Sequence, residues 1–392
     1  MERSLDRVLV THAGALAKPQ ELASLVRARE EGESYDPVAL ERAVAETARS
    51  NVDEQFEVGI DLVNDGEVSK GSFNYYVKAR LGGLTEKVFP PGDGPLRLTA
   101  NAREYAEFPE YFEARMGARA LDRRLFFATE PLTYIGGDII AGDVKNLKGA
   151  LEGRTYTDAI LPCVAPGSIE HWLRNEYYPS QEEFLFALAD AMHEEYRAVV
   201  DAGFIVQVDD PDLPHAWGHV YEIDPSWTVK DYQKYAELRV EALNRAIGDI
   251  PDDRVIAHFC WGGDRPPAGP HSKDLELEHV IDLMYRVKAQ AYSIAAANPR
   301  HEWEWEVFKT HPLPEGKILI PGVLTPYSDV VEHPRTVAQR LVRYGEVVGR
   351  ENVIAGTDCG IGSRATDPKI GWAKLKAMVE GARLASETLW RR

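Results

Sequence analysis

One histidine and two cysteines stand where they could hold a metal ion. His258 and Cys260 follow the apolar run of residues 254–257, and in an extended backbone residues i and i+2 point to the same side. Cys359 follows a second strand-like run, residues 352–355. One imidazole nitrogen and two thiolates can occupy three corners of a tetrahedral zinc site and leave the fourth open, as in catalytic zinc centres. The alternative is a pair of buried, inert cysteines beside a hydrogen-bonded histidine.

An open zinc with two thiolate ligands favours chemistry on a thiol. A substrate thiol that enters the open position loses its proton to the metal and becomes a nucleophile near neutral pH. The pattern therefore predicts a transferase that moves a methyl or other alkyl group onto a substrate thiol activated as a zinc thiolate. A metal-free barrel lyase or decarboxylase is an alternative, but it leaves the three residues unexplained. Cys163 has no partner in the pattern and is not expected to bind zinc.

Other polar side chains fall at or just past the ends of predicted strands. Glu67, in an Asn-Asp-Gly-Glu turn, could hold a substrate ammonium group or serve only as a turn residue. Three carboxylates follow another strand and could form a second divalent-metal site, cap a helix or bind a cationic group. These three are Asp209, Asp210 and Asp212. Two further residues occupy the same position on other strands, His12 and Tyr327.

Two tryptophans alternate with acidic residues at positions 302–306. The simplest interpretation is the first turn of an amphipathic helix beneath the site, from which Glu302 or Glu304 could reach the metal. Three other histidines lack ligand spacing and are expected at the surface. These are His171, His193 and His311.

The elements that must position these residues alternate between strands and helices. Eight short apolar runs are expected to be strands, near residues 7, 60, 158, 204, 254, 290, 317 and 352. Helices are expected from about residue 20, and over residues 36–57, 180–202, 229–247, 275–288, 336–349 and 368–390. Such alternation implies a parallel sheet. Because no G-x-G-x-x-G follows the first strand, a (β/α)₈ TIM barrel is favoured over a doubly wound sheet, with the site at the C-terminal ends of the strands.

The alternation is interrupted after the second predicted strand. Residues 68–157 hold a turn-rich patch at 90–95 and an aromatic, charged helix at 102–116. We interpret residues 1–392 as a single barrel domain in which residues 68–157 form an insertion, or subdomain, that covers one end of the barrel.

The composition indicates which partners and which cellular compartment are expected. The chain has 392 residues, 44% of them hydrophobic, and a formal net charge of −18. That charge disfavours nucleic acid and anionic membranes as partners, and no apolar run approaches the length of a membrane-spanning helix. Three cysteines suit a reducing compartment. We therefore expect a cytoplasmic protein that acts on a small-molecule thiol and an alkyl donor. The sequence is compatible with a homo-oligomer but does not determine the oligomeric state.

Six stretches together resemble a known family. They are THAGALAKP (11–19), GIDLVNDGEVSKGSF (59–73), FIVQVDDPDL (204–213), HFCWGG (258–263), AANPRHEWEW (296–305) and AGTDCG (355–360). With these stretches the chain resembles the cobalamin-independent methionine synthases, in particular short members with a single barrel. The resemblance implies a barrel, a zinc ion held by His258, Cys260 and Cys359, and methyl transfer to the zinc-bound thiolate of homocysteine.

The resemblance also implies roles for the surrounding residues. Glu67 and Asp209 match residues that hold the amino-acid end of homocysteine. Tyr327 takes the position of a family histidine after the seventh strand, which makes it a catalytic candidate. The matching stretches contain three further substrate-binding candidates, His12, Asp210 and Trp261.

Two alanines depart from the family pattern. Ala15 replaces a serine that helps to bind homocysteine, and Ala295 replaces a zinc-binding glutamate after the sixth strand, for which Glu302 or Glu304 could substitute. A zinc ion with only three protein ligands is the stronger Lewis acid, which favours an activated electrophile over the methyl group of a folate amine. Related zinc enzymes that alkylate other thiols, including the opening of epoxides by coenzyme M, are therefore an alternative. A barrel that binds a ligand without catalysis is another.

Overall fold

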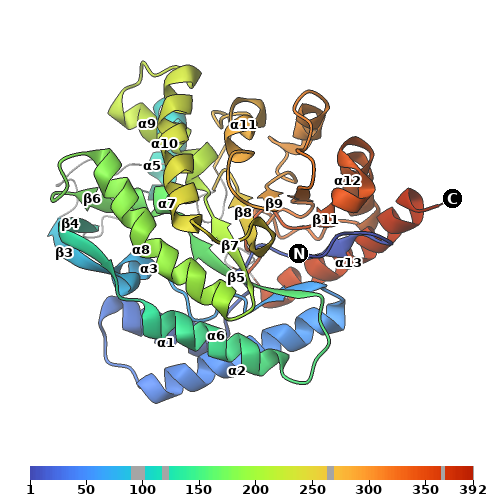
Figure 1. Cartoon of the computed structure of the whole chain (residues 1–392), viewed down its shortest axis with the longest axis horizontal. Coiled ribbons are helices and arrows are strands. Elements are labelled where there is room, and N and C mark those ends of the chain that lie inside the picture. Colours follow the sequence, from blue (N-terminus) through green and yellow to red (C-terminus); the bar gives the residue numbers. More distant parts are fainter. Residues whose placement is uncertain (90–101, 117–122, 263–268, 363–366, 392) are drawn as a thin grey trace.

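The computed structural model describes residues 1–89, 102–116, 123–262, 269–362 and 367–391. Its centre is a parallel sheet of six strands, with a parallel pair of strands beside it. In spatial order the six strands are β10 (Ile318–Pro321), β9 (Ala291–Ile294), β8 (Val255–Phe259), β7 (Ile205–Asp209), β5 (Asp158–Val164) and β2 (Leu62–Asn64). The pair consists of β1 (Leu9–Val10) and β11 (Ile354–Ala355). Figure 1 shows these strands at the centre, with helices around them.

Backbone contacts join the pair to both edges of the six-stranded sheet. On one side, β11 meets β10 through two isolated parallel bridges, Leu319 with Val353 and Gly322 with Gly356. On the other side, the N–H of Asp61, just before β2, donates to the carbonyl of Val10 at 2.9 Å. The sheet is therefore curled and TIM-like, and the α/β class predicted from the sequence is confirmed.

A single apolar layer fills the space inside the curled sheet. It takes one or two residues from each of the parallel strands, and nearly all of them are fully buried: Leu9, Leu62, Ile160, Ile205, Ile256, Ala291, Ile318, Ile320 and Ile354. Because successive residues of a strand point to opposite faces, the neighbours of these residues pack outward against the helices. The interior is thus solid, and the polar residues past the strand ends lie at its rim.

Long helices cover the outer face of the sheet. They are α1 (Gln20–Glu31), α2 (Pro37–Val58), α6 (Gly137–Leu151), α8 (Gln181–Asp201), α10 (Val229–Ile247), α12 (Pro334–Val348) and α13 (Pro368–Leu389). Shorter helices are α3 (Phe73–Arg80), α4 (Ala102–Glu107), α5 (Pro109–Met116), α7 (Pro166–Glu170), α9 (Asp212–Ile223) and α11 (Ile281–Met284). Four 3₁₀ helices complete the described elements: Asp252–Arg254, Leu277–His279, Glu302–Lys309 and Arg350–Asn352. The predicted start of α2 is confirmed, because the Asp36 carboxylate caps the first turn and Pro37 follows it.

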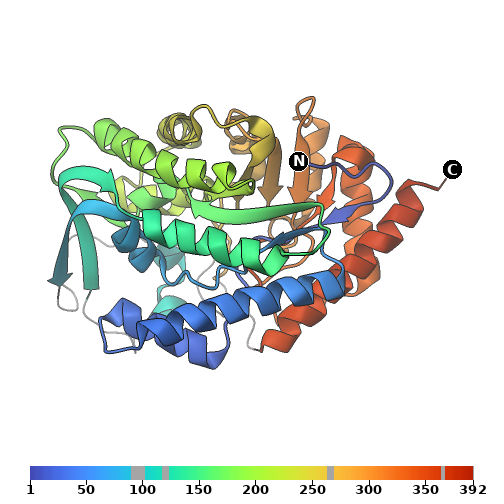
Figure 2. The same cartoon turned by 60° about the horizontal axis from the view of Figure 1, so that its bottom comes forward.

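A small second sheet lies at one side of the molecule (Figure 2). In it β3 (Leu81–Phe89) pairs antiparallel with β4 (Arg123–Tyr134), and β4 pairs parallel with β6 (Leu173–Asn175). Most of this sheet comes from the predicted insertion, but β6 follows β5. The last helix of residues 68–157, α6, packs beside α2 and α8 in the outer helical layer. The turn-rich patch at 90–95 falls outside the described residues.

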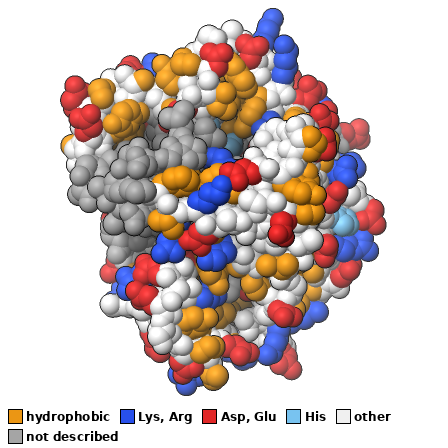
Figure 3. Space-filling view, turned by 90° about the vertical axis from the view of Figure 1, so that its left-hand side faces the viewer, with side chains coloured by type: hydrophobic (Ala, Val, Ile, Leu, Met, Phe, Trp, Pro, Cys, Tyr) orange, Lys and Arg blue, Asp and Glu red, His pale blue; other side chains and the backbone are white. Residues whose placement is uncertain are grey.

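Two predicted helices differ from the structure. Residues 275–288 form only a 3₁₀ turn and the short helix α11. Residues 102–116 form two helices instead of one, and the break falls at Phe108, because Pro109 disfavours helical geometry at the residue before it. Within the described residues, no helix is long and apolar enough to cross a membrane. On the side shown in Figure 3, acidic and basic side chains are intermixed among the coloured residues.

Candidate metal centre

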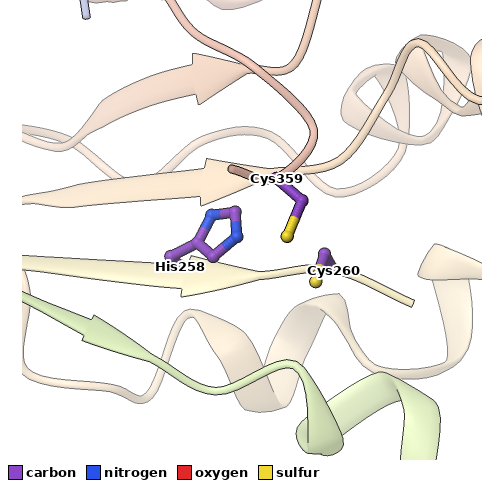
Figure 4. A group of neighbouring side chains, drawn as sticks. All are labelled: His258, Cys260 and Cys359. Carbon is purple, nitrogen blue, oxygen red and sulfur yellow. The ribbon is translucent and has the colours of Figure 1, made fainter. Parts of the chain in front are cut away.

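The end of β8 and the loop after β11 bring His258, Cys260 and Cys359 together. One ligand atom from each residue lies within 4.8 Å of those of the other two. Figure 4 shows both sulfur atoms to the same side of the imidazole ring. His258 and Cys260 are buried, whereas Cys359 is only partly buried, so the group is reached from the side of Cys359. One nitrogen and two sulfur donors suit a tetrahedral zinc ion.

The neighbouring strand fixes the ring orientation of His258. Its Nδ1 lies 2.9 Å from the hydroxyl of Ser293, which stands directly opposite on β9. The other ring nitrogen, Nε2, is buried without a nitrogen or oxygen partner, so it is the atom left to bind a metal. Burial by itself lowers the pKa of the imidazole, but interactions with Cys359 and Asp209 outweigh it, and the pKa is raised.

Two contacts fix the loop that carries Cys359. The Asp358 carboxylate is fully buried and accepts the backbone N–H groups of residues 296 and 297 at 2.7 and 2.8 Å. Burial raises the pKa of Asp358 to about 6, although these hydrogen bonds act to lower it. On the other side, Gly360 packs on Ala15 so closely that a Cβ on the glycine would lie 2.7 Å from the alanine Cβ. The loops after β1 and β11 are thus packed tightly together.

Glu67, in the turn after β2, has both a strained backbone and a partly buried carboxyl group. Its φ is 55°, a left-handed value that is uncommon outside glycine. A side chain at Gly14 would collide with its carboxylate. Burial raises the pKa of Glu67 to about 7; the charge of Lys70 opposes this rise and that of Asp209 adds to it. Strain and perturbed titration together are typical of functional sites.

Asp209 and Asp210 face different surroundings, although they are neighbours in sequence. Asp209 ends β7 opposite His258, and its carboxylate accepts a hydrogen bond from the Gln207 amide at 2.8 Å. Asp210 is buried and accepts the hydroxyl of Ser168 at 2.9 Å. Burial raises the pKa of Asp210 to about 7. Asp209 therefore lies next to the metal-ligand strand, whereas Asp210 is bound to α7.

His12 is a core histidine. It is 1% exposed, and its Nε2 lies 3.0 Å from the side-chain oxygen of Gln55 and 3.3 Å from the amide nitrogen of Asn64. Burial lowers the pKa of His12 to about 4. These bonds tie the end of β1 to α2 and β2, so His12 supports the fold at the rim.

Trp261 and Glu304 belong to a buried network. Trp261 stacks on His301, with ring centroids 4.0 Å apart. His301 bonds to Glu304 through Nδ1 and to Asp274 through Nε2, both at 3.0 Å. Burial alone would lower its pKa, but the two carboxylates raise the pKa of His301 to about 9. The other oxygen of Glu304 accepts the N–H of Leu277 at 2.9 Å, so both of its oxygens are engaged.

The structure brings three protein donors to the centre and engages both glutamates elsewhere. Glu302 pairs with Arg340 at 3.1 Å. Across the described part of the chain, neither Glu302 nor Glu304 joins the group of His258, Cys260 and Cys359. Ala295 is 4% exposed and lines a small enclosed space together with Glu304.

Tyr327 connects the loops after β8 and β10. Its hydroxyl donates to the carbonyl of Gly262, two residues beyond the candidate ligand Cys260. Its ring centroid lies 5.7 Å from that of His271. The next part of the β8 loop, residues 263–268, lies outside the described residues.

A second group of potential ligands was predicted only in part: the sequence indicated Asp212, with Asp209 and Asp210, as a possible second metal site, but not the two histidines that lie beside Asp212. His171, Asp212 and His219 also place one ligand atom each within 4.8 Å of one another. The expectation that His171 lies at the surface was wrong, since it is only 8% exposed. The sequence did contain a signal for part of this group, because Asp212 and His219 are seven residues apart and share one helical face.

The two other histidines that were expected at the surface, His193 and His311, are partly exposed.

Comparisons with known proteins find full-length similarity to methionine synthases, whereas no protein-family model matches the chain. A methionine synthase of Saccharolobus islandicus is 24% identical over 383 residues, which cover 97% of this chain and 96% of that protein. One from Thermococcus kodakarensis is 25% identical, covering 96% and 93%. Among solved structures, a B12-independent methionine synthase from Shewanella sp. W3-18-1, in complex with selenomethionine, has a TM-score of 0.72 and 19% identity, covering 98% and 99%.

These comparisons confirm the resemblance predicted from the sequence. The fold is that of the B12-independent methionine synthases, and the similarity to curated methionine synthases extends over nearly the whole chain.

Proposed function

We propose that the protein is a zinc-dependent methyltransferase that acts on a small-molecule thiol, with homocysteine as the thiol. The observation that carries this proposal is the group of His258, Cys260 and Cys359, in which the Nε2 of the histidine has no nitrogen or oxygen partner. The names of the full-length relatives support methyl transfer to homocysteine. When bound, zinc would supply the Lewis acidity that lowers the pKa of a substrate thiol.

The residues around the centre would bind the amino-acid end of the substrate. The charge of Asp209 adds to the rise in the pKa of Glu67, and these two residues lie at the ends of β7 and β2, respectively, which flank β5. Their carboxylates are suited to accept hydrogen bonds from an ammonium group. Tyr327, whose hydroxyl donates to the carbonyl of Gly262, would hold the residues that directly follow Cys260 in place. Three buried residues, His12, Asp210 and Trp261, would act by supporting the strand ends, because each is already hydrogen-bonded to the protein.

We also propose that residues 1–392 form one (β/α)₈ barrel with residues 68–157 as an insertion. The bridges from β10 to β11 and the bond from Asp61 to Val10 support closure of the sheet. The apolar layer inside, to which each parallel strand contributes, supports a closed barrel as well. In this arrangement the insertion would contribute the small sheet β3–β4 beside one end of the barrel.

Metal analysis combined with an assay for methionine tests the function. Purified protein should carry about one zinc at the thiolate centre and form methionine from homocysteine and a methyl donor. Cys260→Ser and Cys359→Ser should each lose zinc and activity, whereas Cys163→Ser should retain both, because Cys163 lies beside Glu195 and away from the group. Equal zinc content and activity in all three variants would refute the assignment.

A second candidate function is favoured by Ala295 and the two engaged glutamates. With three protein ligands at the centre, the zinc would be more electrophilic than with a fourth, anionic ligand. This favours a donor with a good leaving group, such as an activated methyl group or an epoxide, over methyltetrahydrofolate. A panel of thiols and donors separates the two functions. Methionine formed from homocysteine favours the first, and zinc-dependent alkylation of only another thiol favours the second.

A further inference from the structure

We propose that His171, Asp212 and His219 bind a second divalent transition-metal ion. The Nδ1 atoms of His171 and His219 lie 3.0 and 3.9 Å from one carboxylate oxygen of Asp212. Ligands around a single small ion have separations of this size. The side chains are 5%, 11% and 8% exposed in chain order, so the ion would be largely shielded from water.

One buried nitrogen of this group is unsatisfied. Nδ1 of His171 pairs with the Asp212 carboxylate at 3.0 Å, whereas Nδ1 of His219, 3.9 Å from the same oxygen, is inaccessible to water and makes no hydrogen bond. A buried polar atom without a partner costs about 1–3 kcal/mol. A metal ion placed among the three side chains would bind both nitrogens and the carboxylate at once.

The residues behind His171 support such a role. Its other nitrogen, Nε2, lies 3.2 Å from the hydroxyl of Tyr235, an interaction that leaves Nδ1 for the metal. Metal-binding histidines commonly use the second nitrogen in this way. Tyr235 is itself held beneath the guanidinium of Arg239, 3.3 Å from the ring centroid, and Arg239 pairs with Glu170 at 2.7 Å.

Two secondary-structure elements fix the geometry of the group. His171 follows the last turn of α7, whereas Asp212 begins α9 and His219 lies two turns further along it. The Ser168 hydroxyl in α7 accepts the N–H of Asp212 at 3.4 Å and donates to Asp210 at 2.9 Å. The start of α9 is thus anchored to α7, and the three ligands are held from both sides.

The donor set separates this site from the thiolate centre. Two imidazoles and one carboxylate select borderline ions such as Zn²⁺ or Fe²⁺, and they lack the soft sulfur ligands of His258, Cys260 and Cys359. The proposal rests on its own geometry and does not depend on the proposed methyl transfer.

Cobalt substitution distinguishes the two sites by spectroscopy. After reconstitution with excess Co²⁺ and removal of free metal, the intact protein should retain about two ions per chain. The double variant Cys260→Ser/Cys359→Ser should retain about one, without the intense near-ultraviolet charge-transfer band of cobalt thiolates. His219→Ala should also retain about one, with that band unchanged. Anaerobic titration with Fe²⁺ and Zn²⁺ then identifies the ion that this group prefers.

Controls separate metal loss from misfolding. Asp212→Asn keeps the size of the side chain and should likewise lose one ion, and His193→Ala, a half-buried histidine outside the group, should lose none. Circular dichroism and thermal unfolding check that each variant is folded. One retained ion in the intact protein together with the thiolate band, or equal metal content in the intact protein and in both His219→Ala and Asp212→Asn, would overturn the proposal.

Discussion

The imidazole of His258 is hydrogen-bonded to the hydroxyl of Ser293. Among the residues that the structure describes, no other side-chain oxygen forms a hydrogen bond with this ring. Through this bond Ser293 selects the nitrogen that faces the two thiols. Outer hydrogen bonds of this kind typically contribute 10–100-fold to metal affinity.

We therefore expect Ser293→Ala to weaken zinc binding by about 10–100-fold while leaving the three ligands in place. Competition with a chromophoric chelator measures the affinity. Ser386→Ala is the control, because this serine hydroxyl is also hydrogen-bonded within the protein, but to backbone groups of Val8 and Ala382 and on α13. A zinc affinity of Ser293→Ala equal to that of the control would show that Ser293 does not orient the ligand.

Glu67 makes the proposed binding of an amino-acid substrate dependent on pH. Burial raises its pKa to about 7, so the carboxyl group becomes protonated as the pH falls below 7. A neutral carboxyl loses the attraction for an ammonium group. The KM for the amino-acid thiol should therefore rise as the pH falls from about 8 to about 6, by up to roughly tenfold per unit. Glu67→Gln should give a high KM that varies little with pH; a steep pH dependence in that variant would assign the titration to another group.

The sequence predicted the proximity of side chains at strand ends better than that of side chains on helices. His258 and Cys260 lie together as predicted, because a strand fixes the direction of residues i and i+2. His171 was missed because its partners lie on another helix, and no local period links α7 to α9. Similarly, the carboxylate of Glu304 is committed to His301 and Leu277 by tertiary contacts that the alternation of Trp and Glu does not reveal.

At the scale of elements, a buried carboxylate joins the predicted insertion to the outer helices. Glu195 in α8 accepts hydrogen bonds from Tyr76 and from Arg80 in α3, the latter at 2.8 Å, and from Tyr134 at the end of β4 at 2.7 Å. Arg80 also lies 3.7 Å from Asp143 in α6. One carboxylate thus joins α3, the end of β4 and α8.

Glu195→Gln should lower the free energy of unfolding by about 3 kcal/mol, the lower end of the range for breaking a buried ion pair, because Asp143 still balances part of the arginine charge. Urea denaturation measures the change. Lys78→Ala breaks an exposed pair with Glu86 in the same region and should change stability by at most about 1 kcal/mol. Similar losses in the two variants would mean that the buried network does not anchor the insertion.

The eight strands predicted along the chain are all present, because a buried strand has a short, β-branched apolar run that can be recognised from its own residues alone. The region of residues 275–288 was predicted wrongly for a tertiary reason. There the N–H of Leu277 bonds to the distant Glu304 carboxylate, and the carbonyl of Leu275 accepts the indole N–H of Trp261. Backbone groups that a long helix would pair internally are used to fix the rim of the site.

At the scale of the whole molecule, the proposed zinc site connects distant parts of the chain. The pair β1–β11 is joined to the six-stranded sheet by two isolated bridges to β10 and by single backbone bonds such as that from Asp61 to Val10, which is less than the continuous pairing of β5, β7 and β8. A metal bound by Cys359, a few residues after β11, and by His258 and Cys260 at the end of β8 would cross-link this pair to the centre of the sheet.

Removal of zinc should therefore loosen one side of the molecule and leave the other unchanged. In hydrogen exchange, the amides of β1 and β11, including Thr11, which donates to Ala355 at 2.9 Å, should exchange roughly tenfold faster in the apoprotein, equivalent to about 1.4 kcal/mol of local opening. Amides of β5 and β7 should keep their rates, since their pairing does not involve the metal ligands. Cys163→Ser loaded with zinc should match the intact protein throughout. Equal acceleration across all strands would instead mean that the metal stabilises the fold as one unit, and unchanged rates in β11 would mean that it does not bridge β8 to the end of the sheet.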